Sequence, residues 1–363
     1  MNLLLVISWL WGNLYKFSFF SPEIRLSLLD IAVFFLFILN RKQLLPKYRP
    51  LLKSITVFVV LASISLLIGT FRFGIQAGLV GGLYLLRWII YSVIFIALGS
   101  KIQINKLRVL GLGTVILGIL QYILYPDIRW LAIADWDPHY YRVVSTFLDP
   151  GFTGIIIVFT IILFTLKPVH NRILNLLIWF VSYIILALTY SRASYLAFLA
   201  AFAWISWHKK SWKLFLGIIM LSIVTVYLLP RSPDGEGVKL ERTSTILARI
   251  DNWKKAFSIF IHNPITGVGF NTYRYAQGID LKSHSGAGAD SSLLFVAATT
   301  GIFGLAAYLW YLKHLYTLNP DAYTLQATMV AVLTHSLFLN SLFYPAVMLW
   351  ISLLIIDSNS HLP

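Results

Sequence analysis

The sequence predicts an all-α membrane protein, a polytopic helical bundle of about twelve transmembrane helices with a large helical loop on its outer face. Hydrophobic residues make up 58% of the 363 residues and charged residues only 12%, whereas about a quarter of a soluble domain is charged. The mean hydropathy is +0.78, and the apolar runs approach the length of about 20 residues that crosses a bilayer. The chain has no cysteine. This composition excludes a soluble enzyme, a disulfide-rich secreted domain and a disordered chain.

The apolar runs between charged and turn-forming residues define twelve predicted spans. They lie near residues 2–19, 26–40, 51–69, 83–99, 107–125, 151–166, 171–190, 193–207, 212–229, 291–312, 321–340 and 342–357. Two connections are much longer than the others, at 126–150 and 230–289. We therefore divide the chain into 1–229 with nine spans, the loop 230–289, and 290–363 with the last three spans.

The distribution of charge predicts the orientation in the membrane. Lys and Arg number 29 against 14 Asp and Glu, which gives a net charge of +15. With the N-terminus inside, the predicted inner loops hold more than twice as many basic residues as the short outer loops, the bias that cytoplasmic loops show. Most acidic residues fall on the outer side. We therefore expect both termini in the cytoplasm, basic loops beside anionic membrane lipid, and no nucleic-acid partner.

The long loop 230–289 is not disordered by composition. Its apolar residues recur at intervals of three and four, at Ile246, Ile250, Trp253, Phe257 and Phe260. This spacing predicts an amphipathic helix near 243–262, which ends there because Pro264 follows. The glycines of Gly267–Phe270 then predict a turn that returns the chain toward the membrane.

Four outward features carry the chemistry that the sequence suggests. Arg142 precedes the sixth span, Arg192 lies in the short connection between spans seven and eight, Arg249 lies in the amphipathic helix, and Asp290 begins the tenth span. A single outer arginine can simply reach lipid headgroups, and an aspartate at a helix start is often an N-cap. Several guanidinium groups together, however, suit a lipid-linked diphosphate, because the planar fork binds phosphate bidentately and keeps its proton.

Other polar residues give weaker signals. Asp135 and Asp137 form an Asp-x-Asp pair of the kind that binds a divalent ion and a sugar diphosphate. His284 could act as a general base in the outer loop. His335 and Asn340 are polar residues within the eleventh span, which indicates a site or a buried hydrogen bond. Phosphate-binding P-loops, HExxH motifs and nucleophile elbows are absent from the sequence.

The order of these motifs resembles the O-antigen ligase/polymerase family of bacterial membrane glycosyltransferases. The matching pieces are Arg142…Ser145-Thr146-Phe147…Asp149-Pro150, Ser191-Arg192-Ala193, Arg249…Trp253…Asn263-Pro264-Ile-Thr-Gly267-Val-Gly269-Phe270, and Asp290-Ser291 followed after nine residues by Gly301-Ile-Phe-Gly304. Each piece is short, and their order and shared side of the membrane make the match specific. The resemblance covers most of the chain. The family's ligases carry a histidine where this chain has Asp290.

The resemblance implies transfer of a glycan from undecaprenyl diphosphate to an acceptor sugar hydroxyl, outside the bacterial cytoplasmic membrane, without metal, nucleotide sugar or cofactor. In such an inverting enzyme Arg142, Arg192 and Arg249 would bind the diphosphate. Asp290 would be the general base, with His284 as the alternative base. The aspartate looks more like that of the related peptidoglycan polymerases, so it favours an O-antigen or surface polysaccharide polymerase over a ligase that transfers glycan to lipid A core.

Two other classes remain open on the sequence. A transporter of lipid-linked oligosaccharide would place ionisable residues at the middle of the membrane, for which Asp30 and Arg87 are the candidates. A metal-dependent glycosyltransferase would use Asp135 and Asp137 and would lose activity with a chelator.

Overall fold

The computed structural model describes residues 3–18, 24–39, 46–98, 104–134, 136–231, 235–278, 288–319 and 322–357. The α-helices are α1 (Leu3–Trp11), α2 (Leu28–Leu39), α3 (Arg49–Phe73), α4 (Ile75–Leu98), α5 (Ile104–Leu124), α6 (Pro150–Leu166), α7 (Arg172–Ala187), α8 (Arg192–His208), α9 (Trp212–Leu228), α10 (Ser244–His262), α11 (Tyr273–Ala276), α12 (Ser292–Tyr316), α13 (Tyr323–His335) and α14 (Pro345–Asp357). Short 3-10 helices are η1 (Pro46–Tyr48), η3 (Arg129–Ala134), η4 (Ser145–Phe147), η5 (Glu236–Val238) and η6 (Ser341–Phe343). Within these ranges the strands are β1 (Lys16–Ser18) and β2 (Arg25–Ser27), which pair antiparallel. The predicted all-α class is confirmed.

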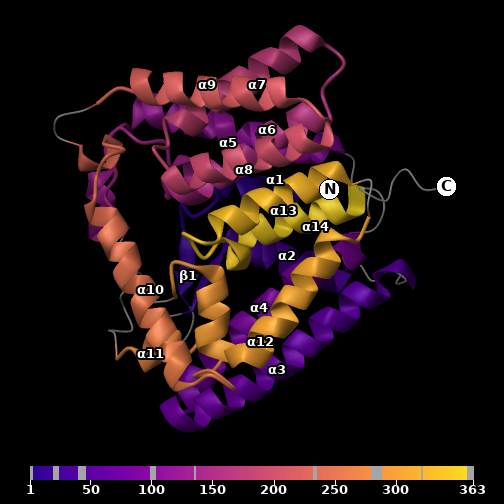
Figure 1. The fold of residues 1–363 in the computed structure, drawn as a ribbon. Helices are drawn as coiled ribbons and strands as arrows, with labels where there is room; N and C mark the ends of the chain where they lie inside the picture. Colours follow the sequence, from indigo (N-terminus) through magenta and orange to yellow (C-terminus); the bar gives the residue numbers. More distant parts are fainter. Residues whose placement is uncertain are drawn as a thin grey trace. The chain divides into compact units, whose positions relative to one another are not determined.

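The contacts divide the chain into two compact units, which we describe separately. Unit 1 contains Met1–Tyr15, Gln103–Thr243 and Asp321–His335, and unit 2 contains Lys16–Ile102, Ser244–Pro320 and Ser336–Pro363. Figure 1 labels the helices of both.

Helix α6 forms the centre of unit 1. Fourteen of its 17 residues are buried, because α5, α7, α8 and α13 all pack against it. Helix α8 also packs along α13. By contrast, α9 buries only Ile218, so most of its apolar surface is left facing outward from the unit, as lipid-facing helices require.

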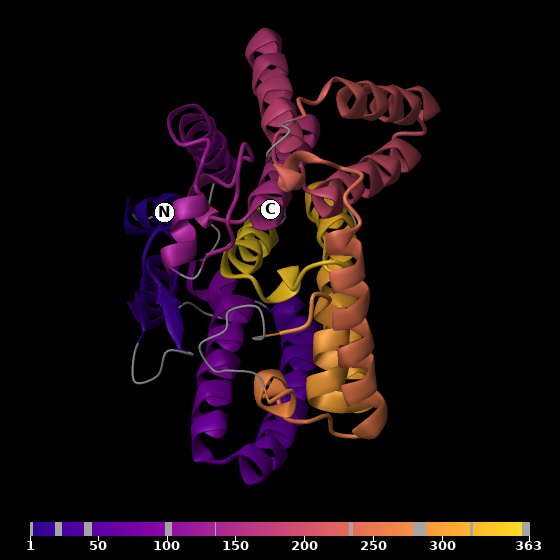
Figure 2. The ribbon, with the colours of Figure 1, turned by 90° about the vertical axis from the view of Figure 1, so that its left-hand side faces the viewer.

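In unit 2, α3 and α4 form a hairpin that turns at Gly74, where φ is +90°; Figure 2 shows the turn at the lower end of these two purple helices. Helix α12 packs against α3 and α10, and α2 and α14 pack against α4. The core between these helices is strongly aromatic, with ring contacts among Phe58, Trp88, Tyr308 and Tyr311.

The protein is a multi-pass membrane protein. Among the described residues, four segments are long and apolar enough to cross a membrane, namely Pro46–Phe73, Ile75–Leu98, Ile104–Leu124 and Ser292–Tyr316. Helices α2, α6, α7, α9 and α14 are apolar but shorter. Each predicted span overlaps a helix, although three of them differ from the helix in length or continuity, and α10 confirms the predicted amphipathic helix. The count of twelve crossings is not confirmed.

The first predicted span, 2–19, is not one helix. Helix α1 ends at Trp11 because Gly12 takes a left-handed φ of +59°. The next residue, Asn13, then bonds to the loop near η4: its backbone N–H donates to Thr146 O and its side chain to Phe147 O. A side chain at Gly12 would lie 2.5 Å from Thr146 O, so the close approach requires glycine.

The tenth predicted span, 291–312, is interrupted. Inside α12, Gly301 has φ 69° and ψ −168°, which no α-helix contains, and the ribbon of α12 bends within its length (Figure 1). The eleventh predicted span, 321–340, is also shorter than expected, because α13 ends at His335.

Candidate functional site

The break in α12 is filled by the loop that follows α10. A broken helix leaves carbonyl groups without their usual partners. Here the backbone N–H of Val268 donates to Ala298 O and that of Gly269 donates to Thr299 O, each at 3.0 Å. The loop that was predicted to return toward the membrane therefore pairs with the backbone of α12 on the N-terminal side of Gly301.

Glycine is required on both sides of this contact. A Cβ atom at Gly267 would lie 2.3 Å from the carbonyl carbon of Thr299, and one at Gly301 would lie 2.2 Å from Ile265 O. Both glycines also have positive φ, at +66° and +69°. The two glycine motifs of the sequence thus form one structure, which fixes the first part of α12 against the C-terminal end of α10.

Asp290 lies two residues before the first residue of α12, and it is not the N-cap, the alternative role that the sequence left open. The N-cap is Ser291, whose extended backbone lets its Oγ accept from the Leu294 N–H at 3.5 Å. The backbone N–H of Asp290 instead donates to Oδ1 of Asn252 on α10, at 2.8 Å. Ser291 is one residue closer to the helix and takes the capping role, which leaves the Asp290 carboxylate without that role.

Helix α10 brings Arg249 to the same part of unit 2. The Arg249 guanidinium carbon lies 6.0 Å from the centre of the Phe338 ring, a cation–π distance. The Trp253 ring lies 5.8 Å from the same phenylalanine. Asn252, whose side chain accepts a hydrogen bond from the backbone N–H of Asp290, lies between Arg249 and Trp253 in the sequence of α10. Arg249 and Asp290 are thus associated with one short stretch of α10.

Tyr273 on α11 is a neighbour of Asp290 that the sequence analysis did not identify. Its side chain is fully buried. Burial raises the pKa of Tyr273 to about 12, and the negative charge of Asp290 contributes to the increase. The hydroxyl therefore stays protonated at neutral pH. Local pattern gave no signal for this tyrosine, because its position depends on the turn at Gly267–Gly269.

In unit 1, Arg142 is held by the connection between α7 and α8. Its Nε donates to Thr189 O at 3.0 Å and its Nη2 to Tyr190 O at 3.4 Å. The side chain is buried, with 9% of its surface exposed. Arg142 therefore does not extend to lipid headgroups as a simple interfacial anchor would.

Arg192, at the start of α8, binds the segment near η5. Its Nη1 donates to Leu240 O at 3.1 Å and to Arg242 O at 2.9 Å. Arg242 itself donates to Gly237 O and Lys239 O, at 2.8 and 2.9 Å.

Arg242 also reaches Tyr190 O, at 3.3 Å, so this carbonyl accepts from both Arg142 and Arg242. The structure thus brings the predicted pair Arg142 and Arg192 together with a third arginine. We call these three residues the arginine cluster.

The backbone around the arginine cluster is strained. Six described residues other than glycine have positive φ, and four of them lie in the segments that hold the cluster: Tyr141, Ser145, Leu148 and Tyr190. Such conformations cost about 1–3 kcal/mol each and concentrate at functional sites.

His139 is a buried histidine that interacts electrostatically with two residues of the arginine cluster. Burial lowers the pKa of His139 to about 3, and the charges of Arg142 and Arg242 lower it further. The imidazole is therefore neutral beside two cations. The region favours anions over further cations, as a diphosphate site requires.

Residues 174–309 match the family model described as O-antigen ligase. Over these residues the chain is similar to the O-antigen ligase/polymerase family, and we call residues 174–309 the O-antigen ligase domain after this match. No curated protein matches the chain. The O-antigen ligase domain contains Arg192, Arg249 and Asp290, and Arg142 precedes it. The family consists of glycosyl-transferring membrane enzymes and implies lipid-linked glycan substrates.

The remaining predicted site residues lie elsewhere. Within the O-antigen ligase domain, His284 lies outside the described residues, as does Asp135 before it, whereas Asp137 is exposed. His335 makes the buried hydrogen bond that its position suggested, because its Nε2 lies 3.2 Å from Ser194 Oγ. In the described part of the chain, no group of three or more His, Cys, Asp and Glu side chains could hold a metal ion.

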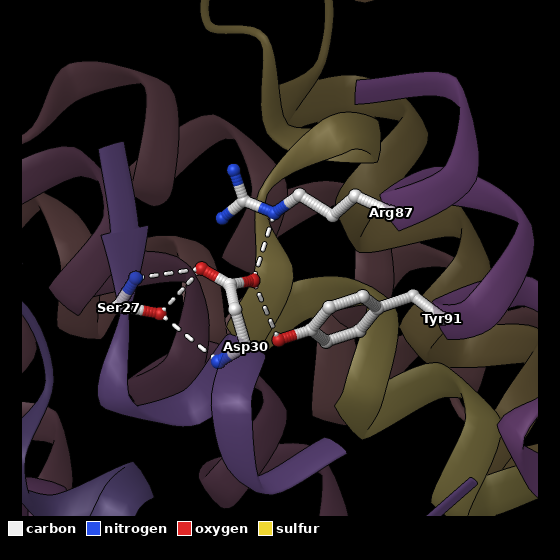
Figure 3. A network of polar contacts seen from close by, with 4 residues as sticks. All are labelled: Ser27, Asp30, Arg87 and Tyr91. Carbon is white, nitrogen blue, oxygen red and sulfur yellow. Dashed lines mark hydrogen bonds and ion pairs between the residues drawn. The ribbon is translucent and has the colours of Figure 1, made fainter. Parts of the chain in front are cut away.

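The two ionisable residues that a transporter would use form an internal ion pair in unit 2 (Figure 3). Asp30 and Ser27 make a capping box at the start of α2: Ser27 N–H and Oγ donate to Oδ2, each at 2.8 Å, and Asp30 N–H donates back to Ser27 Oγ. The other carboxylate oxygen contacts Arg87 Nε at 2.8 Å and accepts from Tyr91 Oη at 3.0 Å. Both carboxylate oxygens thus have internal partners, as a buried ion pair requires.

Proposed function

We propose that this protein is an inverting, metal-independent glycosyltransferase that polymerises oligosaccharide repeat units from undecaprenyl diphosphate on the outer face of the cytoplasmic membrane. The observation that carries the proposal is a carboxylate, Asp290, which lies just before the N-cap of α12 within the O-antigen ligase domain and is not itself the helix cap. The O-antigen ligase match and the electropositive arginine cluster support it.

In the proposed reaction, a hydroxyl oxygen of the acceptor sugar attacks C1 of the donor glycan. The bond between C1 and the phosphate oxygen breaks, and undecaprenyl diphosphate leaves with the electron pair. Asp290 accepts the hydroxyl proton. A single displacement of this kind inverts the configuration at C1. The leaving group carries the developing negative charge, so positioned cations stabilise the transition state.

The proposal assigns the cation role to Arg142 and Arg192 in unit 1 and to Arg249 in unit 2. His284 is the alternative base. Arginine suits this role because its charge persists at every physiological pH and its fork matches phosphate oxygens. Both termini are proposed to lie in the cytoplasm, following the excess of basic residues in the predicted inner loops.

A ligase that transfers the glycan to lipid A core or another acceptor is the second candidate, because the matching family model is described as O-antigen ligase. The aspartate in place of the family's histidine favours the polymerase. The two differ in what they need: a polymerase uses lipid-linked repeat units as both donor and acceptor, whereas a ligase requires a separate acceptor.

The test uses the purified full-length protein in detergent with lipid-linked repeat units as the only glycan and a chelator present. We expect a ladder of polymer lengths and release of undecaprenyl diphosphate. A ladder that appears only after lipid A core is added would indicate the ligase. The absence of any glycosyl transfer, or activity that a chelator abolishes and Mg²⁺ restores, would contradict the proposed mechanism.

A further inference from the structure

Among the described residues, several buried polar atoms of unit 2 have no hydrogen-bond partner, and four of them lie on segments near Asp290. They are Nε1 of Trp253, Oη of Tyr273, Nε2 of Gln277 and Oδ1 of Asn340. Native proteins satisfy the large majority of buried polar atoms, because an unsatisfied one loses its hydration without compensation. A group of them on segments near one carboxylate therefore makes these atoms candidates for binding a polar ligand.

Trp253 approaches Asp290 from α10. It follows Asn252, whose side chain accepts from the Asp290 backbone N–H at 2.8 Å. The indole ring packs beside Phe338, with the ring centres 5.8 Å apart. The indole N–H can only donate a hydrogen bond.

Tyr273 and Gln277 approach from α11. The charge of Asp290 contributes to the raised pKa of Tyr273, which places the two groups within electrostatic reach. The tyrosine ring lies 6.3 Å from Phe295 near the start of α12, and Gln277 follows one helical turn later. The neutral phenol can donate and accept, and the amide nitrogen of Gln277 can donate.

Asn340 approaches from the segment before α14. A Cβ atom on Gly288, two residues before Asp290, would lie 3.3 Å from Asn340 Nδ2. The segment is held at the start of α12, because the Leu342 N–H donates to Ser292 Oγ at 3.2 Å. The amide oxygen of Asn340 can only accept.

We propose that Trp253, Tyr273, Gln277 and Asn340 bind the hydroxyl groups of the acceptor sugar and present one of them to Asp290. This inference rests on the proposed function, since it takes Asp290 as the base. The four atoms combine donors, an acceptor and a group that is both, and they are flanked by the aromatic rings of Phe295 and Phe338. Neutral polar groups next to aromatic rings suit a neutral sugar with many hydroxyls better than a phosphate, for which arginine is the matching group.

The experiment measures binding of a defined probe to the purified full-length protein. The probe is the oligosaccharide repeat unit that accumulates on lipid in cells without this protein, released from the lipid so that it lacks the diphosphate. Its Kd is measured by thermal stabilisation for the wild type, Trp253→Phe and Tyr273→Phe, which remove one polar atom each and keep a ring. Tyr275→Phe is the matched control, because it removes a hydroxyl from the same short helix, where Tyr275 stacks on Phe73.

We expect the probe Kd to rise about tenfold in Trp253→Phe and in Tyr273→Phe, as for the loss of one hydrogen bond. The control should stay within about twofold of the wild type. Without the probe, the midpoint temperature of Tyr273→Phe should equal that of the wild type or exceed it by about 2 °C, because the variant loses an unsatisfied hydroxyl.

An unchanged Kd in both variants, or a wild type that the probe does not stabilise, would overturn the inference. So would a lowered midpoint temperature with unchanged Kd, which would mean that the groups are structural or hold buried water. The Asp290→Asn variant separates this outcome from failure of the proposed function. If Asp290→Asn keeps wild-type turnover while Tyr273→Phe weakens binding, the base assignment fails and the sugar site stands. If Asp290→Asn is inactive and both Kd values are unchanged, only the sugar site fails.

Discussion

The polar groups of the arginine cluster in unit 1 and those near Asp290 in unit 2 differ in their hydrogen bonding. Arg142, Arg192 and Arg242 donate to backbone carbonyls of their own unit, so their positions are fixed and the region is electropositive. Around Asp290, neutral polar atoms are buried without partners. Fixed cations suit a charged leaving group, and unsatisfied neutral groups suit hydroxyls. Under the proposed function, the arginine cluster would serve the charged leaving group, whereas the surroundings of Asp290 would combine hydroxyl chemistry with the single cation Arg249.

The largest effect should come from Asp290→Asn, which removes the proposed proton acceptor and keeps the shape of the side chain. We expect the turnover number for polymer formation to fall by about 10²–10⁴-fold, with the donor KM unchanged. Thermal stability should stay near the wild-type value, because Ser291 caps α12 and the contact with Asn252 uses the backbone of residue 290. Wild-type turnover in this variant would contradict the assignment of Asp290 as the base and would favour His284.

A somewhat smaller effect is expected from Arg192→Gln, which removes a charge from the arginine cluster. The kcat/KM for the lipid-linked donor should fall by about 10- to 100-fold, because a hydrogen bond to a charged group is worth about 1.5–3 kcal/mol. The matched control is Arg231→Gln, whose exposed side chain pairs with Glu241 at 3.5 Å and should change little. Equal losses in the two variants would mean that net charge, and not the cluster, binds the donor.

The glycine contact that fixes α12 should affect folding more than chemistry. Gly301→Ala should lower the free energy of unfolding by about 2 kcal/mol or more, since it adds a Cβ at positive φ against Ile265 O. Gly217→Ala on α9 is the control: it has open space around it and should be neutral or stabilising by about 0.5–1 kcal/mol. Equal midpoint temperatures for the two variants would argue against the broken helix.

The smallest effect at neutral pH concerns His139, whose pKa is lowered to about 3. Below pH 6.5 the unfolded chain binds a proton that the folded protein excludes. The contribution of His139 to the free energy of unfolding is therefore fully present above pH 6.5. It decreases as the pH falls toward 3, by at most about 1.4 kcal/mol per pH unit. His139→Asn should remove this slope in midpoint temperatures measured between pH 7.5 and 4.5. If the midpoint temperatures of the two proteins fell in parallel with pH, the prediction that His139 is neutral in the folded protein would be contradicted.

Sequence patterns predicted the elements whose information is local. The amphipathic spacing predicted α10 to within a residue at its start, and Pro264 predicted its end. The break at Gly301 could not be predicted from local sequence. A glycine in an apolar run is also compatible with a continuous membrane helix, and only the contact with Ile265 decides its conformation.

The candidate site was predictable only in part, for a similar reason. Outer arginines and Asp290 were identifiable by residue type and order, and the family model supports that order. Arg242 and Tyr273 belong to no pattern, since each acquires its role when distant segments fold together. The sequence left open whether Asp290 is an N-cap, because Asp290 and Ser291 are both good caps and only the backbone geometry distinguishes them.

The most direct test of proton transfer at Asp290 is the pH dependence of single-turnover glycosyl transfer in the wild type and in Asp290→His. Imidazole ordinarily titrates near pH 6.5 and a carboxyl group near pH 3.9, and a base must be deprotonated to act. We predict that Asp290→His keeps partial activity and that the acid side of its profile moves to higher pH than in the wild type. Identical profiles, with activity in both proteins, would contradict the assignment of Asp290 as the base.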